Sequence, residues 1–180
     1  MFAASNPASE GLWLTLEVQN PASLGGHHIL HVEDLVGPDR VEIPGLPRPA
    51  ALLLFTTTAE DCADPRGLCR RVREQTEAVR KRGALVVAVV LTARERVPIV
   101  REKMAAVRTP IVLALDPHHH VERAFGLRGP GRFLVLDADG VSQRVSVGSM
   151  LNQGVVLERD LVRVVEATSY AMARVTEDEE

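Results

Sequence analysis

Cys62 and Cys69 are the residues whose chemistry stands out in this sequence. They are its two cysteines, with six residues between them, in the stretch FTTTAEDCADPRGLC. A thiolate attacks peroxides and disulfides, and two thiols that meet can store two electrons as a disulfide. Because this stretch joins an apolar run to an Arg-rich helical pattern, we expect a helix N-terminus to favour the Cys62 thiolate. The carboxylates of Glu60, Asp61 and Asp64 act in the opposite sense.

Both cysteines also have a structural interpretation. Cys69 shares a predicted apolar helix face with Val72, Thr76 and Val79, which is typical of a small buried side chain. If Cys62 reacts, Cys69 is the candidate for a resolving thiol. The sequence therefore leaves open a redox pair or two buried structural residues.

Other residues with ligand chemistry occur in two histidine groups, HHILH at 27–31 and HHH at 118–120. No cysteine or carboxylate joins them at a zinc-binding spacing, so we expect solvent-exposed histidines and no metal. The glycines around Pro130 lack the dinucleotide-binding spacing and precede a strand, which indicates a turn and no nucleotide cofactor.

Continuous apolar runs predict the strands that position these residues. The runs are AALLLF at 50–55, ALVVAVVL at 84–91 and PIVLAL at 110–115. Such runs are typical of parallel strands covered on both faces. RFLVLDADGVSQRVSV at 132–147 predicts an antiparallel hairpin. We expect the 50–55 strand in the middle of the sheet, with a neighbour on each side.

Apolar residues at helical spacing predict the helices between these strands. The first is expected to take Asp64 as its N-cap and Pro65 as its first residue, and to end at Gly83. Further helices are expected at 94–108 with Pro98 in the first turn, after Asp116 as N-cap with Pro117 as first residue, and at 161–172.

The alternation of strands and helices predicts an α/β fold with a central mixed sheet flanked by helices. Residues 1–27 are expected to form an N-terminal extension that contains a strand within 12–19. Residues 28–174 form the main domain, and residues 175–180 form an acidic tail.

Two stretches carry a resemblance to a known family. FGLRGPGRFLVLDADGVSQRVSVG (125–148) and LDPHHHVERAFGL (115–127), together with a cysteine at the first strand-to-helix junction, resemble the thioredoxin-like superfamily in its peroxiredoxin/redoxin (AhpC/TSA-type) branch. The resemblance covers roughly residues 28–170. It implies a thioredoxin-like fold with an N-terminal β extension. It also implies a thiol-dependent oxidoreductase that reduces peroxide or disulfide and needs a thiol reductant.

The resemblance implies catalytic roles for five residues, namely Cys62, Cys69, Thr58, Pro130 and Arg132. Pro130 stands where the family has its cis-proline beside the reactive cysteine. Ala59 occupies the family's threonine position, with Thr56, Thr57 and Thr58 just upstream. Typical peroxiredoxins have an arginine where Pro130 stands, and Arg132 is the nearest arginine here. These departures keep an alternative open: a catalytically degenerate domain that binds a protein partner or assembles as a subunit or homodimer.

Composition limits the remaining classes. The 180 residues are 46% hydrophobic and 25% charged, which is typical of one globular domain. A net charge of −3 does not favour nucleic-acid binding. No run reaches about 18 apolar residues, so no membrane span is expected. The N-terminus lacks a secretory signal pattern, and the two cysteines then favour the cytoplasm.

Three geometric expectations follow for the thiols. The Gly129–Pro130 bond is expected to be cis and near the start of the Cys62 helix. In one unbroken helix the two cysteines would lie about 10.5 Å apart, too far for a disulfide unless the chain unwinds or folds back. We expect reduced, separated thiols, with Cys62 more exposed than Cys69.

Overall fold

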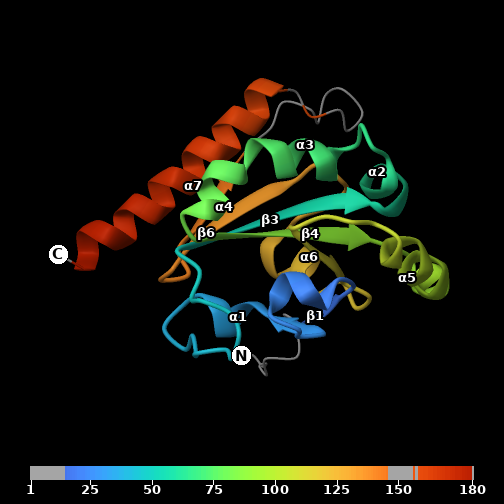
Figure 1. Cartoon of the computed structure of the whole chain (residues 1–180), viewed down its shortest axis with the longest axis horizontal. Helices are drawn as coiled ribbons and strands as arrows, with labels where there is room; N and C mark the ends of the chain where they lie inside the picture. Colours follow the sequence, from blue (N-terminus) through green and yellow to red (C-terminus); the bar gives the residue numbers. More distant parts are fainter. Residues whose placement is uncertain (1–14, 146–155, 157, 180) are drawn as a thin grey trace.

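The computed structural model describes residues 15–145, 156 and 158–179. It is an α/β structure in which helices cover both faces of one sheet (Figure 1). The strands are β1 Thr15–Val18, β2 Ile29–His31, β3 Ala51–Thr58, β4 Ala84–Leu91, β5 Val112–Leu115, β6 Phe133–Asp137 and β7 Ser142–Val145. The helices are η3 Pro21–Leu24, α1 Val32–Leu35, α2 Ala59–Ala63, α3 Leu68–Gln75, α4 Glu77–Lys81, η4 Arg94–Arg96, α5 Val97–Ala105, α6 His120–Phe125 and α7 Glu158–Glu179.

The described strands form a mixed sheet in the order β2-β1-β5-β4-β3-β6-β7. β3 pairs in parallel with β4, and β4 in parallel with β5. β6 runs antiparallel to both β3 and β7. The three parallel strands, the closing hairpin and the inner position of β3 are therefore confirmed.

Two apolar cores lie on opposite faces of this sheet. Along β3, Ala51, Leu53 and Phe55 belong to the core shared with α2, α3, α4, α5 and α7. Leu52 and Leu54 belong to the other core, shared with α1, α6 and the N-terminal strands. Because side chains alternate along a strand, the whole run is buried and no polar face marks either side. Cys62 and Cys69 both lie in the first core.

The N-terminal strand β1 is an inner strand of the sheet, paired antiparallel with β2 and with β5. Glu17 of β1 forms a two-point ion pair with Arg101 of α5, at 2.5 and 2.9 Å. Hydrogen bonding to Arg101 lowers the pKa of Glu17. The N-terminal β element expected from the sequence thus completes the sheet, and the expected boundary at residue 27 falls between two paired strands.

The helix predicted after β3 differs from the structure in two ways. Asp64 does not begin a helix and Pro65 lies in a loop, because the chain forms the separate helices α2 and α3 on either side. The predicted continuous helix is also interrupted at Thr76, whose hydroxyl donates to the Val72 carbonyl at 2.7 Å. Pro98 lies in the first turn of α5 as predicted.

Asp116 caps α6 as predicted, but from further away along the chain. Its carboxylate accepts hydrogen bonds from the backbone N–H groups of His120 and Val121, at 2.8 and 2.9 Å. The helix begins at His120, after His119 has adopted a left-handed backbone conformation, so Pro117 lies outside it. In the part of the chain that the structure describes, no helix is long and apolar enough to cross a membrane.

Candidate functional site

Cys62 lies in the short helix α2, directly after the central strand β3. The Thr58 side chain caps this helix by accepting a hydrogen bond from the Asp61 N–H at 3.1 Å. Cys62 is the fourth of the five residues of α2 and is buried. The sequence prediction placed Cys62 outside a helix, ahead of an Asp64 cap. That prediction is wrong, because Asp64 is the residue at which α2 ends.

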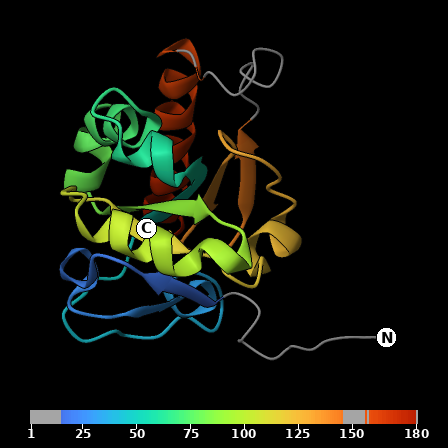
Figure 2. The same ribbon diagram turned by 90° about the vertical axis from the view of Figure 1, so that its right-hand side faces the viewer.

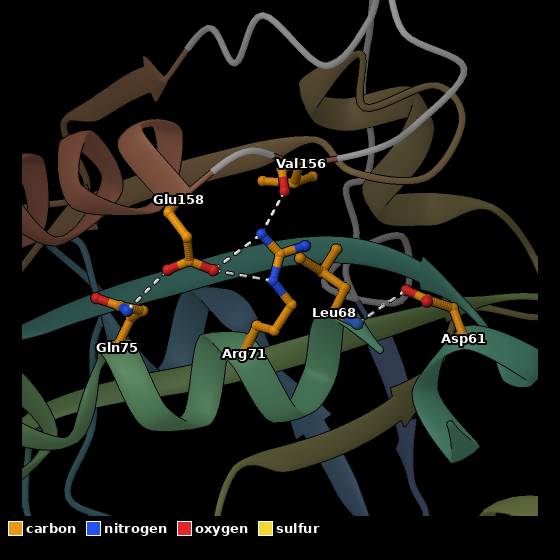
Figure 3. Close-up of polar contacts among 6 residues, drawn as sticks. All are labelled: Asp61, Leu68, Arg71, Gln75, Val156 and Glu158. Carbon is orange, nitrogen blue, oxygen red and sulfur yellow. Dashed lines mark hydrogen bonds and ion pairs between the residues drawn. The ribbon is translucent and has the colours of Figure 1, made fainter. Parts of the chain in front are cut away.

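The chain folds back between α2 and α3. The Gly67 N–H donates to the Asp64 carbonyl at 2.9 Å and closes a turn. The Asp61 carboxylate then accepts a hydrogen bond from the Leu68 N–H, the first of α3, at 3.1 Å (Figure 3). The same carboxylate oxygen accepts from the Thr57 hydroxyl at 3.3 Å. Asp61 therefore ties the end of β3 to the start of α3.

Gly67 makes this close approach possible. A Cβ at this position would lie 1.8 Å from the Asp61 carbonyl oxygen, well inside any real contact. Its backbone angles, φ −77° and ψ 178°, are available to every residue, so the requirement is steric. A side chain at residue 67 would push α2 and α3 apart.

The fold-back brings the two cysteines into contact. Cys69 is the second residue of α3, and its thiol lies beside that of Cys62 in the same core. Both cysteines are reduced, as expected. The expected separation is wrong, and the exposed fractions of 4% for Cys62 and 3% for Cys69 leave almost no difference in exposure between them. A disulfide between these cysteines requires the chain to unwind or fold back, and the structure contains the fold-back.

The pKa of the Cys69 thiol is raised. The side-chain interaction with Cys62 is the largest cause, followed by burial and by electrostatic interactions with Cys62 and Asp61. A hydrogen bond from Thr57 acts in the opposite direction. The Cys69 thiol therefore keeps its proton to a higher pH than a free cysteine does.

A cavity of about 410 Å³ opens onto the thiol pair. Its lining comes from α2, α3, α5 and the segments that follow α2 and α5. Figure 2 views the molecule from the side on which α5 lies. The lining of the cavity consists of Cys62, Ala63, Asp64, Pro65, Cys69, Arg70, Arg73, Lys103, Ala106, Val107, Arg108 and Thr109. Four of these residues are cations and one is a carboxylate. The thiols thus sit at the wall of a positively charged cavity.

The other predicted catalytic residues do not meet the thiols through any interaction that the structure describes. The Thr58 hydroxyl serves as a helix cap. The Arg132 Nε donates to the Arg128 carbonyl at 2.7 Å, within its own loop. Thr56 is the β3 residue that contacts the 129–132 segment, for its hydroxyl donates to the Gly129 carbonyl at 2.7 Å.

The predicted cis bond at Gly129–Pro130 is also wrong, since every peptide bond of the described chain is trans. The backbone of the loop instead joins the sheet. The Gly131 N–H donates to the Thr56 carbonyl at 2.8 Å, and the Thr56 N–H donates to the Arg132 carbonyl at 3.0 Å. These two backbone bonds after Pro130, and the Thr56 hydroxyl bond to Gly129 before it, hold Pro130 near the end of β3.

The histidines do not form a metal site among the residues that the structure describes. His119 interacts with Glu122, with 2.8 Å between Nδ1 and Oε2. Burial lowers the pKa of His120. The histidine groups therefore give no support to metal chemistry.

Sequence reasoning missed four kinds of site residue. Thr57 interacts with Cys69 and Asp61. Side chains alternate along β3, so Thr57 lies on the same face as Phe55, which is the face that carries the thiols. Asp61 stands out in the sequence only as a repulsive charge, and the steric need for a glycine at residue 67 arises only from the fold-back onto the Asp61 carbonyl. The cavity cations Lys103 and Arg108 come from a segment far along the chain, so local spacing carried no signal for them.

Comparison with solved structures identifies the fold. The putative thiol:disulfide interchange protein DsbE from Chlorobium tepidum is 16% identical with a TM-score of 0.56, covering 88% of this chain and 92% of that one. The MTB protein dsbF, solved in mixed oxidized and reduced forms, is 15% identical with a TM-score of 0.54, covering 88% and 96%. Thioredoxin peroxidase I of Plasmodium yoelii is 12% identical with a TM-score of 0.52, covering 92% and 87%.

At these identities the likeness establishes the fold alone, and that fold is thioredoxin-like, as the sequence predicted. No family model matches the sequence, and no curated protein matches it.

Proposed function

We propose that this protein is a thiol-disulfide oxidoreductase that works through the Cys62–Cys69 pair. The observation that carries the proposal is the contact between the two thiols, which a break in the helix and the fold-back at Gly67 bring together. The thioredoxin-like fold of the chain supports it, as does the position of the pair beside an open cavity.

The proposed reaction is two successive thiol-disulfide exchanges. The Cys62 sulfur attacks one sulfur of a substrate disulfide, forms a mixed disulfide and releases the first substrate thiolate. The Cys69 sulfur then attacks Cys62, forms the Cys62–Cys69 disulfide and releases the second thiolate. The protein dithiol loses two electrons, the substrate gains two, and the two thiol protons pass to the released thiols. A dithiol reductant returns the protein to its starting state.

The surroundings of the thiols favour a disulfide over a peroxide as the oxidant. Peroxide reduction is assisted by donors that hold the O–O bond in line with the thiolate. The resemblance offered Thr58 and Arg132 for this work, but no interaction described in the structure links either side chain to the thiols: Thr58 caps α2, and Arg132 donates to the Arg128 carbonyl. Disulfide exchange needs no such donors.

The alternative function is that of a catalytically inactive domain that binds a protein partner. Burial of both sulfurs favours it, since thiols with 4% and 3% exposure meet solution reagents slowly. The two functions differ in whether the pair changes redox state under mild conditions.

The test is a redox titration with mixtures of reduced and oxidised dithiothreitol, followed by mass spectrometry of the alkylated protein. We expect the loss of two free thiols together and an intramolecular Cys62–Cys69 link. The protein should also speed the reduction of insulin disulfides by dithiothreitol, and Cys62→Ser should abolish this activity.

Cys69→Ser assigns the two roles. This variant keeps the attacking sulfur and lacks the resolving one, so we expect it to accumulate a mixed disulfide on Cys62 with the substrate thiol. If wild-type protein keeps both thiols across the titration and adds no insulin-reducing activity over the Cys62→Ser variant, the oxidoreductase is excluded and the binding domain stands.

A further inference from the structure

We propose that the cavity beside the thiol pair selects small disulfides that carry carboxylates. This proposal rests on the oxidoreductase function and specifies its substrate class. The cavity would receive the anionic arms of the substrate while the S–S bond meets Cys62.

The charge of the lining is the first ground. Arg70 and Arg73 project from α3, Lys103 belongs to α5, and Arg108 follows α5 in the chain. Asp64 is the carboxylate in the lining, and its Oδ1 accepts the Arg66 N–H at 2.9 Å. Several cations around a concave surface concentrate field lines and raise the local concentration of an anion.

The availability of these cations is the second ground. Arg70 approaches Glu74 at 3.8 Å and Lys103 approaches Glu60 at 3.9 Å, which are long, exposed pairs that hold their cations weakly. The side chains of Arg73 and Arg108 form no ion pair with any residue of the described ranges. Two guanidinium groups at the cavity are thus available to a ligand, and a guanidinium binds a carboxylate through two parallel hydrogen bonds.

The size of the cavity is the third ground. Its volume of about 410 Å³ falls in the range of small-molecule pockets. Cys62 and Cys69 are part of the same lining as the cations, so an anion bound there brings its S–S bond toward the pair. A small disulfide with a carboxylate on each arm satisfies both the charge and the volume.

The experiment compares three disulfides of similar size and different charge: dithiodipropionate (anionic), hydroxyethyl disulfide (neutral) and cystamine (cationic). The rate of oxidation of the reduced protein is divided by the rate for dithiothreitol with the same disulfide. This division removes the difference in leaving-thiol reactivity. We expect the normalised rate for the anionic disulfide to exceed that for the cationic one by about tenfold or more at low salt. The preference should fall as potassium chloride screens the charges.

Arg73→Gln and Arg108→Gln are the test variants. Each should lower the ratio of the anionic to the neutral rate, and the double variant should lower it by about tenfold. Arg48→Gln removes one exposed positive charge from a loop outside this cavity and is the matched control. It should leave the ratio within about twofold of the wild-type value, since exposed charges outside the site are largely screened.

The outcomes distinguish failure of the anionic selectivity from failure of the oxidoreductase function on which it rests. If no disulfide oxidises the pair, the oxidoreductase itself fails. If all three oxidise it with equal normalised rates, or if the Arg48 control shifts the ratio as much as the double variant, the enzyme stands and the anionic selectivity is wrong. A salt-sensitive anionic preference that the double variant abolishes supports the proposal.

Discussion

Thr57 is the strand residue through which β3 influences the thiols. Thr57 is fully buried, and its hydroxyl has a single hydrogen, which it can give either to the Asp61 carboxylate or to a Cys69 thiolate. In the second arrangement it lowers the pKa of Cys69. A hydroxyl that donates to a thiolate stabilises the charged form. The residue therefore eases ionisation of a sulfur that its other neighbours hold in the protonated state.

Thr57→Val should make Cys69 harder to ionise while keeping the shape of the side chain. Without the hydroxyl the pKa of Cys69 rises further, so less thiolate is present at a given pH. In the Cys62→Ser background, alkylation of Cys69 by iodoacetamide at alkaline pH should slow by about threefold to tenfold, since one pKa unit corresponds to tenfold in thiolate.

Thr168→Val is the control for this measurement. Thr168 is equally buried, and its hydroxyl bonds the Val164 carbonyl at 2.8 Å within α7. It should cost similar stability and leave the alkylation rate unchanged. Equal slowing in both variants would mean that the Thr57 effect comes from loosened packing.

At the scale of elements, the turn between α2 and α3 controls whether the thiols meet. In Gly67→Ala the new Cβ would meet the Asp61 carbonyl oxygen, so the two helices must separate. Overpacking of this kind costs about 1–3 kcal/mol of stability. We also expect disulfide formation between Cys62 and Cys69 to slow, as followed by thiol titration during oxidation.

Gly26→Ala is the control that distinguishes a general loss of stability from a change in the geometry of the thiols. Gly26 has φ +89° with nothing within 4 Å of an added Cβ, so alanine there strains the backbone and touches no neighbour. It should lower stability without changing the rate of disulfide formation. If Gly67→Ala behaves in the same way, the fold-back does not depend on a glycine.

The link between α3 and α7 is a second element-scale contact. Arg71 of α3 donates to Glu158 at 3.0 and 3.1 Å and also to the Val156 carbonyl, and Gln75 donates to Glu158 at 2.9 Å (Figure 3). Glu158 is the first residue of α7, where a negative charge is favoured. The helix that carries Cys69 thus holds the start of the C-terminal helix.

Arg71→Ala should destabilise the protein more than Glu158→Gln does. Glu158→Gln weakens an exposed ion pair worth about 0–1 kcal/mol. Arg71→Ala also removes the donor to a carbonyl of the buried Val156, for about 1–3 kcal/mol in total. Urea unfolding gives both values, and hydrogen exchange should show faster opening of the first turn of α7. Equal losses in the two variants would mean that the Val156 contact contributes nothing.

The sequence predicted the elements better than it predicted the site. Continuous apolar runs such as ALLLF identify β3 as a strand buried on both faces, and period-two alternation then separates the two cores. Because both faces of β3 are buried, the sequence pattern does not show which face carries the thiols. It therefore could not distinguish Thr57 from the other threonines of β3. The Asp64-Pro65 pair imitates a helix start, but Asp61 makes the bond to the first N–H of α3, across a turn that only tertiary packing reveals.

At the scale of the whole molecule, the buried Cys69 links folding to pH. The pKa of this thiol is raised in the folded protein, whereas in the unfolded chain it returns to about 8.5. Above that pH the unfolded state loses a proton that the folded state keeps. The unfolded state then binds fewer protons, so the free energy of unfolding falls as pH rises.

The predicted slope is at most about 1.4 kcal/mol per pH unit, which amounts to about 2 kcal/mol between pH 8.5 and 10. The measurement is urea unfolding from pH 7 to 10 with a reducing agent present, for the wild type and for Cys69→Ala. Groups that do not interact with Cys69 contribute equally to both proteins, so the difference between the two curves reports on the Cys62–Cys69 pair. Cys69→Ala loses some packing at every pH, which lowers its curve by a constant amount without changing its slope.

The two curves should therefore converge as pH rises above 8.5, because only the wild type has a Cys69 thiol that the folded state keeps protonated. Parallel curves across this range would mean that Cys69 ionises as readily in the folded protein as in the unfolded chain.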